Sequence, residues 1–428
     1  MMSLTIRVIF ATFALVMLSS TTFAQRVNYE EPPISYSISL PDNAISKLQT
    51  QIDDGAKSLK FDGLRGYLKS LLEALEISST SQVMSFSRTS LQDDRISPRT
   101  PRALYFNDEV HVGFVQNGMI EIVACDSKLG MVFYTLKQSE DEPPVFKRQT
   151  NSCLTCHGAA RTKNVPGLLV RSVYPDPGGH PVVAAGSFLS TPRSPLKQRW
   201  GGWYVTGTHG DQQHLGNFVL ATAKKPKTID NTAGHNLQDL KDRFDTTRYL
   251  SPHSDLVALM VLEHQTDTFN ILTTASFEMR HAQYAIEQAG DDTAKSKAEK
   301  LLADRLAKNT EQIVRAFLFA DEAKLTAPVT GTSDFATEFA TRGSKDSKGR
   351  SLRDFDLQTR MFKYPCSYLI HTPTFDGLPD NLRKSIGMRM NEILAMPEPP
   401  NGLEHLTEAD RTAIAEILKE TRPDFLNP

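Results

Sequence analysis

The residues best suited to chemistry lie in one short segment, which reads Asn-Ser-Cys-Leu-Thr-Cys-His-Gly over residues 151–158. Two residues separate Cys153 from Cys156, a spacing that lets the two thiols reach the two vinyl groups on one edge of a porphyrin. His157 follows the second cysteine directly, which places an imidazole under the porphyrin iron. The pattern predicts two thioether bonds and one axial iron ligand, and therefore a single covalent haem c.

Three other interpretations of the cysteine pair are weaker. A zinc site needs two more ligands at suitable spacing, and the sequence has no second Cys-x-x-Cys and no His-x-His cluster. A redox-active Cys-x-x-Cys usually opens a helix in a βαβ unit, whereas a polar loop is expected before Cys153. A structural disulfide between residues so close in sequence is strained and uncommon.

The segment from Cys153 to Gly158 resembles the haem-attachment motif of the c-type cytochromes, and the resemblance covers this segment only. It implies thioether bonds from Cys153 and Cys156, with His157 as the proximal ligand. The rest of the chain departs from a small helical cytochrome c, because strands are expected around the motif and no methionine lies between His157 and Met260. We therefore expect a non-standard mono-haem host domain. Its arrangement is faintly similar to PAS-like haem sensor domains.

The sequence leaves the sixth iron ligand open. His209 and His214 lie in a glycine-rich segment that also holds both tryptophans, where backbone and indole rings can approach a flat cofactor closely. His264 lies on an apolar helical stripe, where a histidine is more often a hydrogen-bonded core residue. His180 and Met260 are weaker candidates. Water, or no sixth ligand at all, is a further alternative.

Residues 1–24 have the organisation of a secretory signal. Arg7 precedes an apolar run over residues 8–18, and the small residues Thr22 and Ala24 stand where a signal peptidase cleaves. The run is shorter than the roughly 20 residues of a spanning helix, and no later stretch is apolar enough to span a membrane. We expect cleavage near Ala24 and a periplasmic or extracellular mature protein, which agrees with attachment of haem c outside the cytoplasm.

The remaining sequence predicts an α+β fold in three parts. Residues 25–102 form an N-terminal region with helical spacing over 42–77 and a linker over 80–102. Residues 103–235 form a β-rich haem domain built on a small antiparallel sheet. Residues 236–428 form a mainly α-helical C-terminal domain.

Short runs of β-branched and aromatic residues predict the strands, with Asn117-Gly118 as a hairpin turn and residues 139–152 as a loop. The expected strands are 110–115, 119–123, 131–136, 167–174 and 182–188, with 201–208 and 217–222 continuing the sheet. The expected helices are 254–288, 291–324, 379–395 and 407–421, with a surface loop over 326–350.

Composition excludes several classes of function. The formal net charge of −2 provides no basic surplus for nucleic-acid binding. Four cysteines in 428 residues exclude a scaffold built on disulfides. Cys125 and Cys366 are either one disulfide or two separate buried thiols, and the sequence does not choose between these.

Electron transfer through the haem to a redox partner of unknown identity is the leading functional hypothesis, since most single-haem proteins with this motif carry electrons. The alternative is a haem-based sensor or gas-binding protein with an open distal site. A haem oxidoreductase such as a peroxidase ranks below both, because it needs an open iron and a distal acid/base pair. The chain is thus expected to be an electron carrier rather than an enzyme.

Overall fold

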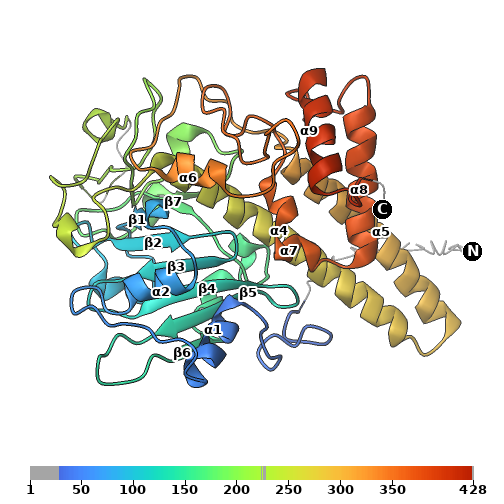
Figure 1. The fold of residues 1–428 in the computed structure, drawn as a ribbon, viewed down its shortest axis with the longest axis horizontal. Coiled ribbons are helices and arrows are strands. Elements are labelled where there is room, and N and C mark those ends of the chain that lie inside the picture. Colours follow the sequence, from blue (N-terminus) through green and yellow to red (C-terminus); the bar gives the residue numbers. More distant parts are fainter. Residues whose placement is uncertain (1–27, 223, 225–227, 427–428) are drawn as a thin grey trace, which may run out of the picture.

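The computed structural model describes residues 28–222, 224 and 228–426. The expected signal segment, residues 1–24, lies outside this part of the chain. A seven-stranded antiparallel sheet occupies the N-terminal half and helices dominate the C-terminal half (Figure 1). The predicted α+β fold class is confirmed.

The main sheet is an antiparallel meander to which one later strand is added. Strands β1 to β6 pair in sequence order, and β9 returns from beyond the cysteine motif to pair with β1. β7 and β8 form a separate two-stranded sheet. The bounds are β1 Val83–Ser85, β2 Arg102–Phe106, β3 Val110–Phe114, β4 Ile120–Asp126, β5 Gly130–Leu136, β6 Phe146–Gln149, β7 Arg171–Val173, β8 Ser187–Leu189 and β9 Trp203–Tyr204.

Polar turn residues set the register of the meander. The side chains of Asn107 and Asp126 each accept hydrogen bonds from the backbone N–H groups two and three residues ahead, at the β2–β3 and β4–β5 turns. Asn117 lies in the β3–β4 turn with φ 55°, a left-handed conformation that asparagine tolerates. The hairpin predicted from Asn117-Gly118 is confirmed.

The helices follow the sheet in the chain, apart from the two that precede it and the short α3 after β6. Their bounds are α1 Ala44–Asp53, α2 Leu68–Ala74, α3 Leu154–His157, α4 Leu256–Glu287, α5 Asp292–Phe317, α6 Phe335–Thr341, α7 Pro373–Asp376, α8 Asp380–Ala395 and α9 Glu408–Thr421. The predicted helices 254–288, 379–395 and 407–421 are confirmed as α4, α8 and α9.

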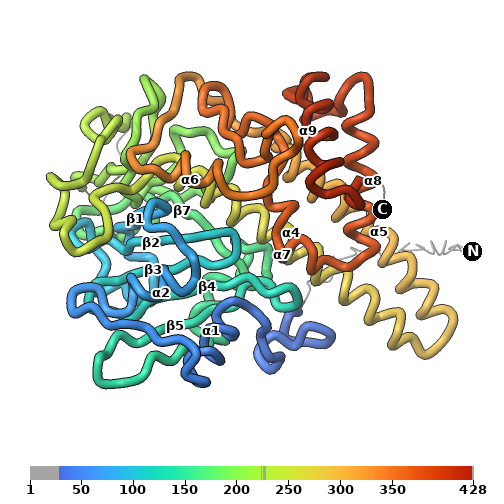
Figure 2. Tube along the Cα trace, in the orientation of Figure 1, coloured from blue at the N-terminus to red at the C-terminus, as the bar shows by residue number. Residues whose placement is uncertain are grey.

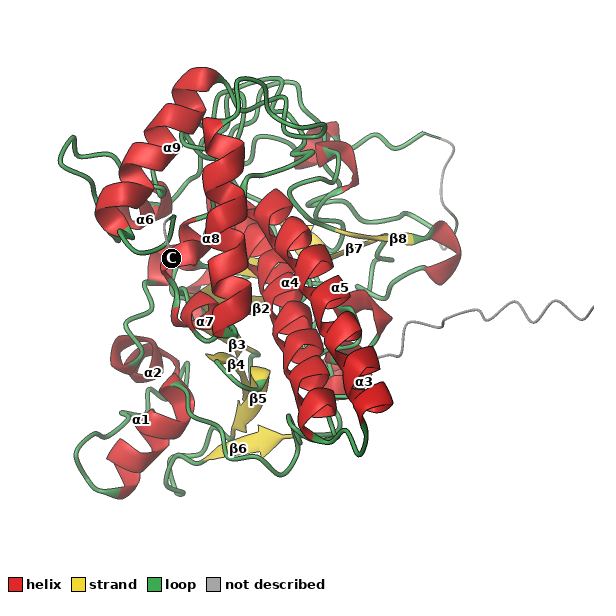
Figure 3. Cartoon of the chain, turned by 90° about the vertical axis from the view of Figure 1, so that its right-hand side faces the viewer, coloured by secondary structure: helices red, strands yellow, loops and turns green. Residues whose placement is uncertain are grey.

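Helix α4 is the element around which the rest is assembled. It contacts β1 and β5 of the sheet and packs along α5, which in turn packs on α8, and α8 on α9. Figure 3 shows α4 and α5 side by side with the strands beside them. Most of α4 is buried around its whole circumference, as expected for a helix covered on every side.

The N-terminus of α4 is fixed by Asp255, which is completely buried. Its Oδ1 accepts hydrogen bonds from the N–H groups of Val257 and Ala258, the usual N-cap arrangement. Its Oδ2 accepts hydrogen bonds from the N–H groups of Thr332 and Ser333, on the segment before α6. One carboxylate therefore caps the helix and holds a distant loop.

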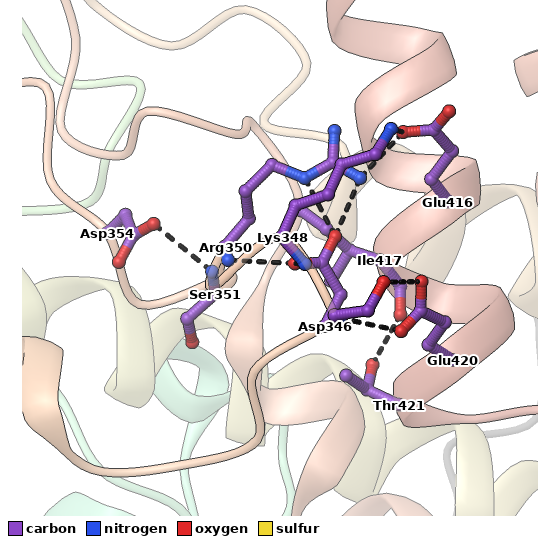
Figure 4. A network of polar contacts seen from close by, with 10 residues as sticks. Asp346, Lys348, Arg350, Ser351, Asp354, Glu416, Ile417, Glu420 and Thr421 are labelled. Atoms are coloured by element: carbon purple, nitrogen blue, oxygen red, sulfur yellow. Dashed lines mark hydrogen bonds and ion pairs between the residues drawn. The ribbon is translucent and has the colours of Figure 1, made fainter.

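The irregular segments gather on two sides of this core. Figure 2 shows residues 228–255, in yellow-green, at the end of the molecule opposite α8 and α9. The turn over residues 346–350 is tied instead to α9 by a group of ion pairs (Figure 4), in which Arg350 binds both Asp346 and Glu416, and Lys348 also binds Glu416. This network holds the loop after α6 against the last helix.

Several strand predictions were wrong. Residues 80–102 are not a linker, because they contain β1, which is buried on both faces and too short to show alternation. Residues 139–152 contain the edge strand β6, in which three of the four residues are polar and only Phe146 is fully buried. Residues 183–185 form a 3₁₀ turn before β8. Residues 217–222 form no strand, since Asn217 has φ 67° and its amide bonds the carbonyls of Val205 and Gly234.

Some helix predictions also need correction. The helical spacing over 42–77 corresponds to two short helices, with exposed Leu64 in the turn between them. α5 ends at Phe317, short of residue 324, because Phe319 and Asp321 adopt positive φ. The expected loop over 326–350 contains α6, whose residues Phe335 and Phe339 are buried.

One continuous group of buried apolar side chains extends from Ile34 to Leu426, and it includes residues on both sides of the expected division at residue 235. A smaller group surrounds Tyr174 and Leu220. The three-part division stays a prediction. None of the helices in the described ranges combines the length and the apolar character that crossing a bilayer requires.

Candidate functional site

The cysteine motif forms a single helical turn, α3. The N–H of His157 bonds the carbonyl of Cys153 at 2.9 Å, and the N–H of Gly158 bonds the carbonyl of Leu154 at 2.9 Å. This turn places Cys153 and His157 on the same side of the helix. Cys153 is half-buried, Cys156 is exposed, and both thiols are free. The disulfide interpretation of the motif therefore finds no support in the structure.

The imidazole of His157 is oriented through one nitrogen. Its Nδ1 lies 2.9 Å from the carbonyl oxygen of Gly167, which can only accept, so Nδ1 carries the proton. The ring also packs against Phe133, with the ring centroids 5.1 Å apart. Within the described part of the chain Nε2 has no hydrogen-bond partner. Burial lowers the pKa of His157, which favours the neutral ring that a metal ligand needs.

Gly158 ends the turn at a close contact. A Cβ at this position would lie 2.6 Å from the hydroxyl oxygen of Tyr29 and 3.0 Å from the carbonyl oxygen of Leu154. A larger residue at this position would therefore require the Tyr29 side chain to shift.

Charged side chains lie near Cys156 and His157. Arg171, at the start of β7, is close enough to Cys156 and Arg161 for their charges to act on it, and burial lowers its pKa. Its buried Nε has no hydrogen-bond partner, although a terminal nitrogen bonds Ser187. On the other side, Arg102 pairs with Glu121 at 2.8 Å and both charges act on His157.

These residues fit a covalent haem. The thiols are free and the histidine presents an unengaged Nε2. The positive charge of Arg171 near Cys156 suits an anionic group such as a haem propionate. Cys153, Cys156 and His157 are the residues that the sequence predicted, and their role stays a prediction. Sequence reasoning missed Phe133, Gly167 and Arg171, since nothing in their local sequence distinguishes them from ordinary strand and loop residues.

Two of the predicted distal ligands, His209 and His214, lie together, and the structure adds His235 to them. The ring centroids are 4.6 Å apart for His209 and His214, 5.2 Å for His209 and His235, and 4.9 Å for His214 and His235. Trp200 packs against His214 at 5.5 Å. We call His209, His214 and His235 the histidine cluster.

The two inner members of the histidine cluster are completely enclosed. Burial is the main cause that lowers the pKa of both His209 and His214. The neighbouring His235 lowers both pKa values further, and His209 also lowers that of His214. His209 Nε2 accepts a hydrogen bond from the N–H of Asn236 at 3.2 Å, whereas the buried Nδ1 atoms of both have no partner. Across the described residues, no set of three or more His, Cys, Asp or Glu side chains is arranged to hold a metal ion.

The third predicted distal ligand, His264, is a core residue. Its Nε2 lies 2.7 Å from Ser367 Oγ and its Nδ1 lies 3.4 Å from Thr268 Oγ1, so both nitrogens have hydroxyl partners. The ring stacks on Phe319 with centroids 4.6 Å apart. Burial lowers the pKa of His264 to about 3. This is the arrangement that the apolar helical stripe favoured.

The remaining candidates are also placed. His180 is exposed and faces Asp176 across its turn. Met260 is buried on α4. Of the two tryptophans, Trp200 is buried beside His214, and the indole of Trp203 bonds the carbonyl of Arg171 at 2.8 Å. Trp203 therefore supports the strand that carries Arg171.

Cys125 and Cys366 are two separate buried thiols in this structure. Cys125 lies on β4 with its sulfur 3.9 Å from the sulfur of Met131, and burial raises its pKa to about 12. Of the two alternatives that the sequence left open, the structure has the unpaired one.

No family model, curated protein or solved structure matches this chain. The site therefore has to be interpreted from its own geometry.

Proposed function

We propose that this protein carries one haem c, bound covalently through Cys153 and Cys156 with His157 as the proximal ligand, and that it transfers electrons to a redox partner. The observation that carries the proposal is the geometry of His157. Its Nδ1 is held by the Gly167 carbonyl at 2.9 Å while Nε2 stays unengaged, next to two free thiols in one helical turn. A bound haem supplies one-electron exchange between ferric and ferrous iron.

The chain's own residues have distinct parts in this proposal. The thiols of Cys153 and Cys156 fix the cofactor to α3. The Gly167 carbonyl fixes the tautomer and the ring plane of His157, and such a partner raises the basicity of a ligating nitrogen. The Arg171 guanidinium offers a charge-assisted contact to an anionic edge of the cofactor.

A second function, reversible binding of a diatomic gas, is favoured by the predicted distal ligands. Both nitrogens of His264 have hydroxyl partners, and His209 and His214 are enclosed among one another and Trp200. The pairing of both His264 nitrogens and the enclosure of His209 and His214 would leave the sixth position of the iron to water or to an external ligand. Without a sixth protein ligand, the haem becomes a gas-binding site rather than an electron carrier.

The test is the absorption spectrum of the reduced protein, purified from a host that attaches haem to exported proteins, before and after addition of carbon monoxide. A sharp low-spin spectrum that carbon monoxide does not change supports electron transfer. A high-spin spectrum that shifts supports gas binding. Absence of haem bands in such a host contradicts both functions.

We further propose that the protein is exported, with the signal cleaved near Ala24. The sequence of residues 1–24 supports this, together with the need of haem c attachment for a compartment outside the cytoplasm. N-terminal sequencing of the mature protein is expected to begin at or near Gln25. A mature chain that retains residues 1–24 contradicts cleavage.

A further inference from the structure

The loop that carries the Gly167 carbonyl is held by a side chain far along the sequence. Asn270, on α4, is buried and bonds the backbone of Leu168 twice. Its Oδ1 accepts from the N–H of Leu168 at 3.0 Å, and its Nδ2 donates to the carbonyl of Leu168 at 2.6 Å. One amide thus satisfies both backbone groups of a single residue, as a neighbouring strand would.

Gly167 is in direct contact with the same amide. A Cβ at this position would lie 2.1 Å from Asn270 Oδ1 and 3.1 Å from Thr162 Cβ, so only glycine fits between the loop and α4. The N–H of Gly167 bonds the carbonyl of His157 at 2.8 Å, and its own carbonyl faces His157 Nδ1. The backbone of Gly167 therefore contacts His157 twice, and Asn270 fixes that backbone.

The loop is also attached on the side of the sheet. The N–H of Met131, on β5, bonds the carbonyl of Pro166 at 3.4 Å, the residue before Gly167. This bond is long, whereas both bonds of Asn270 are short. The stronger attachment is to α4, whose start is fixed by the buried Asp255.

We propose that Asn270 is a positioning residue for the iron ligand: by holding the 167–168 backbone against α4, it fixes the strength and direction of the hydrogen bond from His157 Nδ1. The inference rests on the proposed haem function. A firm hydrogen bond from Nδ1 makes the imidazole a better donor to ferric iron, so it lowers the reduction potential of the haem. Asn270 reaches the iron only through Gly167 and His157.

The experiment is a redox titration of the purified haem-bearing protein and its Asn270→Ala variant. We expect covalent haem to be retained, because both thiols are untouched, and the midpoint potential to become more positive, because a loosened Gly167 carbonyl accepts a weaker hydrogen bond. Asn309→Ala is the matched control. Asn309, on α5, is also buried, but its amide donates to the carboxylate of Glu278 instead of bonding the backbone of Leu168. The midpoint potential of the Asn309→Ala variant should equal that of the wild type.

Asn270→Asp provides a second variant if the alanine variant does not fold. It keeps the shape and the acceptor oxygen, and it replaces the donor to Leu168 with a carboxylate oxygen that repels the Leu168 carbonyl. A positive shift in midpoint potential is again expected. A potential unchanged in every folded Asn270 variant overturns the inference, and so does an equal shift in Asn309→Ala.

Gly167→Ala in two backgrounds gives an independent test. In the wild type the added methyl group collides with Asn270 Oδ1, so the potential should move clearly. In an Asn270→Ala background the collision is removed, and the further shift should be much smaller. Equal shifts in the two backgrounds contradict direct coupling. Haem missing from the wild type itself contradicts the proposed function instead, so the two failures are distinguishable.

Discussion

His157 and His264 are both held by α4 and have opposite arrangements. His264 is part of the helix, and hydroxyl groups of Ser367 and Thr268 engage both of its nitrogens. His157 is outside the helix, and a backbone carbonyl supported by Asn270 engages one nitrogen only. Burial lowers the pKa of both. The difference shows that a spare nitrogen, rather than burial or a neutral ring, distinguishes a candidate ligand from a core histidine.

The histidine cluster is an intermediate case. The Nδ1 atoms of His209 and His214 are buried and unpartnered, and burying a polar atom without a hydrogen bond makes folding less favourable. Yet the ring contacts of these imidazoles are with each other, with His235 and with Trp200. A spare nitrogen is therefore a useful criterion only where it lies next to groups that can hold the cofactor.

The largest expected effect is the loss of covalent haem when the motif cysteines are replaced, compared with no loss when a cysteine of the core near His264 is replaced. Replacing both motif cysteines, Cys153→Ser with Cys156→Ser, removes both thioether bonds, so haem staining on a denaturing gel should disappear. Cys366→Ala, which removes a buried thiol from the core near His264, should retain the stain. A stained band in the double variant would show that the attachment is elsewhere.

The comparison of the two histidines is tested directly by His157→Ala and His264→Ala. His157→Ala should change the absorption spectrum of the iron while the thioether bonds persist. His264→Ala should leave the spectrum unchanged and lower the free energy of unfolding by about 1–3 kcal/mol, because Ser367 loses a buried partner. Absorption spectra and urea titrations measure both. An altered iron spectrum in His264→Ala would make that residue the sixth ligand.

Asp255→Ala should destabilise the surroundings of His157 and of His264 together, because α4 supports both residues. The variant loses the helix cap and two backbone hydrogen bonds from the segment before α6. We expect a loss of about 2–3 kcal/mol in the free energy of unfolding. Tryptophan fluorescence and haem absorbance, followed in the same urea titration, should give coincident transitions. Separate transitions would mean that the motif is stabilised independently of α4.

The smallest effect is a dependence of stability on pH. The pKa of His264 is about 3 and the pKa of His214 is well below its ordinary 6.5 because burial disfavours the charged form. The unfolded chain therefore binds protons that the folded chain does not, and stability is complete above pH 6.5 and falls as the pH drops below it.

Below pH 6.5, each such histidine lowers the free energy of unfolding by up to about 1.4 kcal/mol per pH unit. Urea titrations between pH 8 and pH 5 measure the slope, and His264→Gln should flatten it. A slope that is the same in this variant would show that other groups cause the acid sensitivity.

The sequence predicted those parts of the fold that have a regular pattern. The long apolar stripe predicted α4, and Asn117-Gly118 predicted the hairpin between β3 and β4. β1 and β6 were missed because the first is too short to alternate and the second is a polar edge strand. Residues such as Asn217 break an expected strand through a left-handed backbone and side-chain bonds that arise only from tertiary contacts.

The residues of the candidate site also fall into those that the sequence could predict and those that only the folded chain brings together. Cys153, Cys156 and His157 are adjacent in sequence, so their spacing alone carries the chemistry. Asn270 and Gly167 meet only in the folded chain, and an asparagine on a helix has no local feature that connects it to a distant loop. His235 joins His209 and His214 for the same reason, through the folding of a long irregular segment.

The clamp on Gly167 also sets an order in time. In the proposed export the chain crosses the membrane from its N-terminus, so Cys153, Cys156 and His157 would reach the outer compartment before Asn270. Until α4 docks, the loop beside His157 lacks the amide that later holds it, and the thiols belong to an unfinished surface. A cofactor can thus be joined to an open segment first and be locked in place afterwards, when the long helix completes the fold.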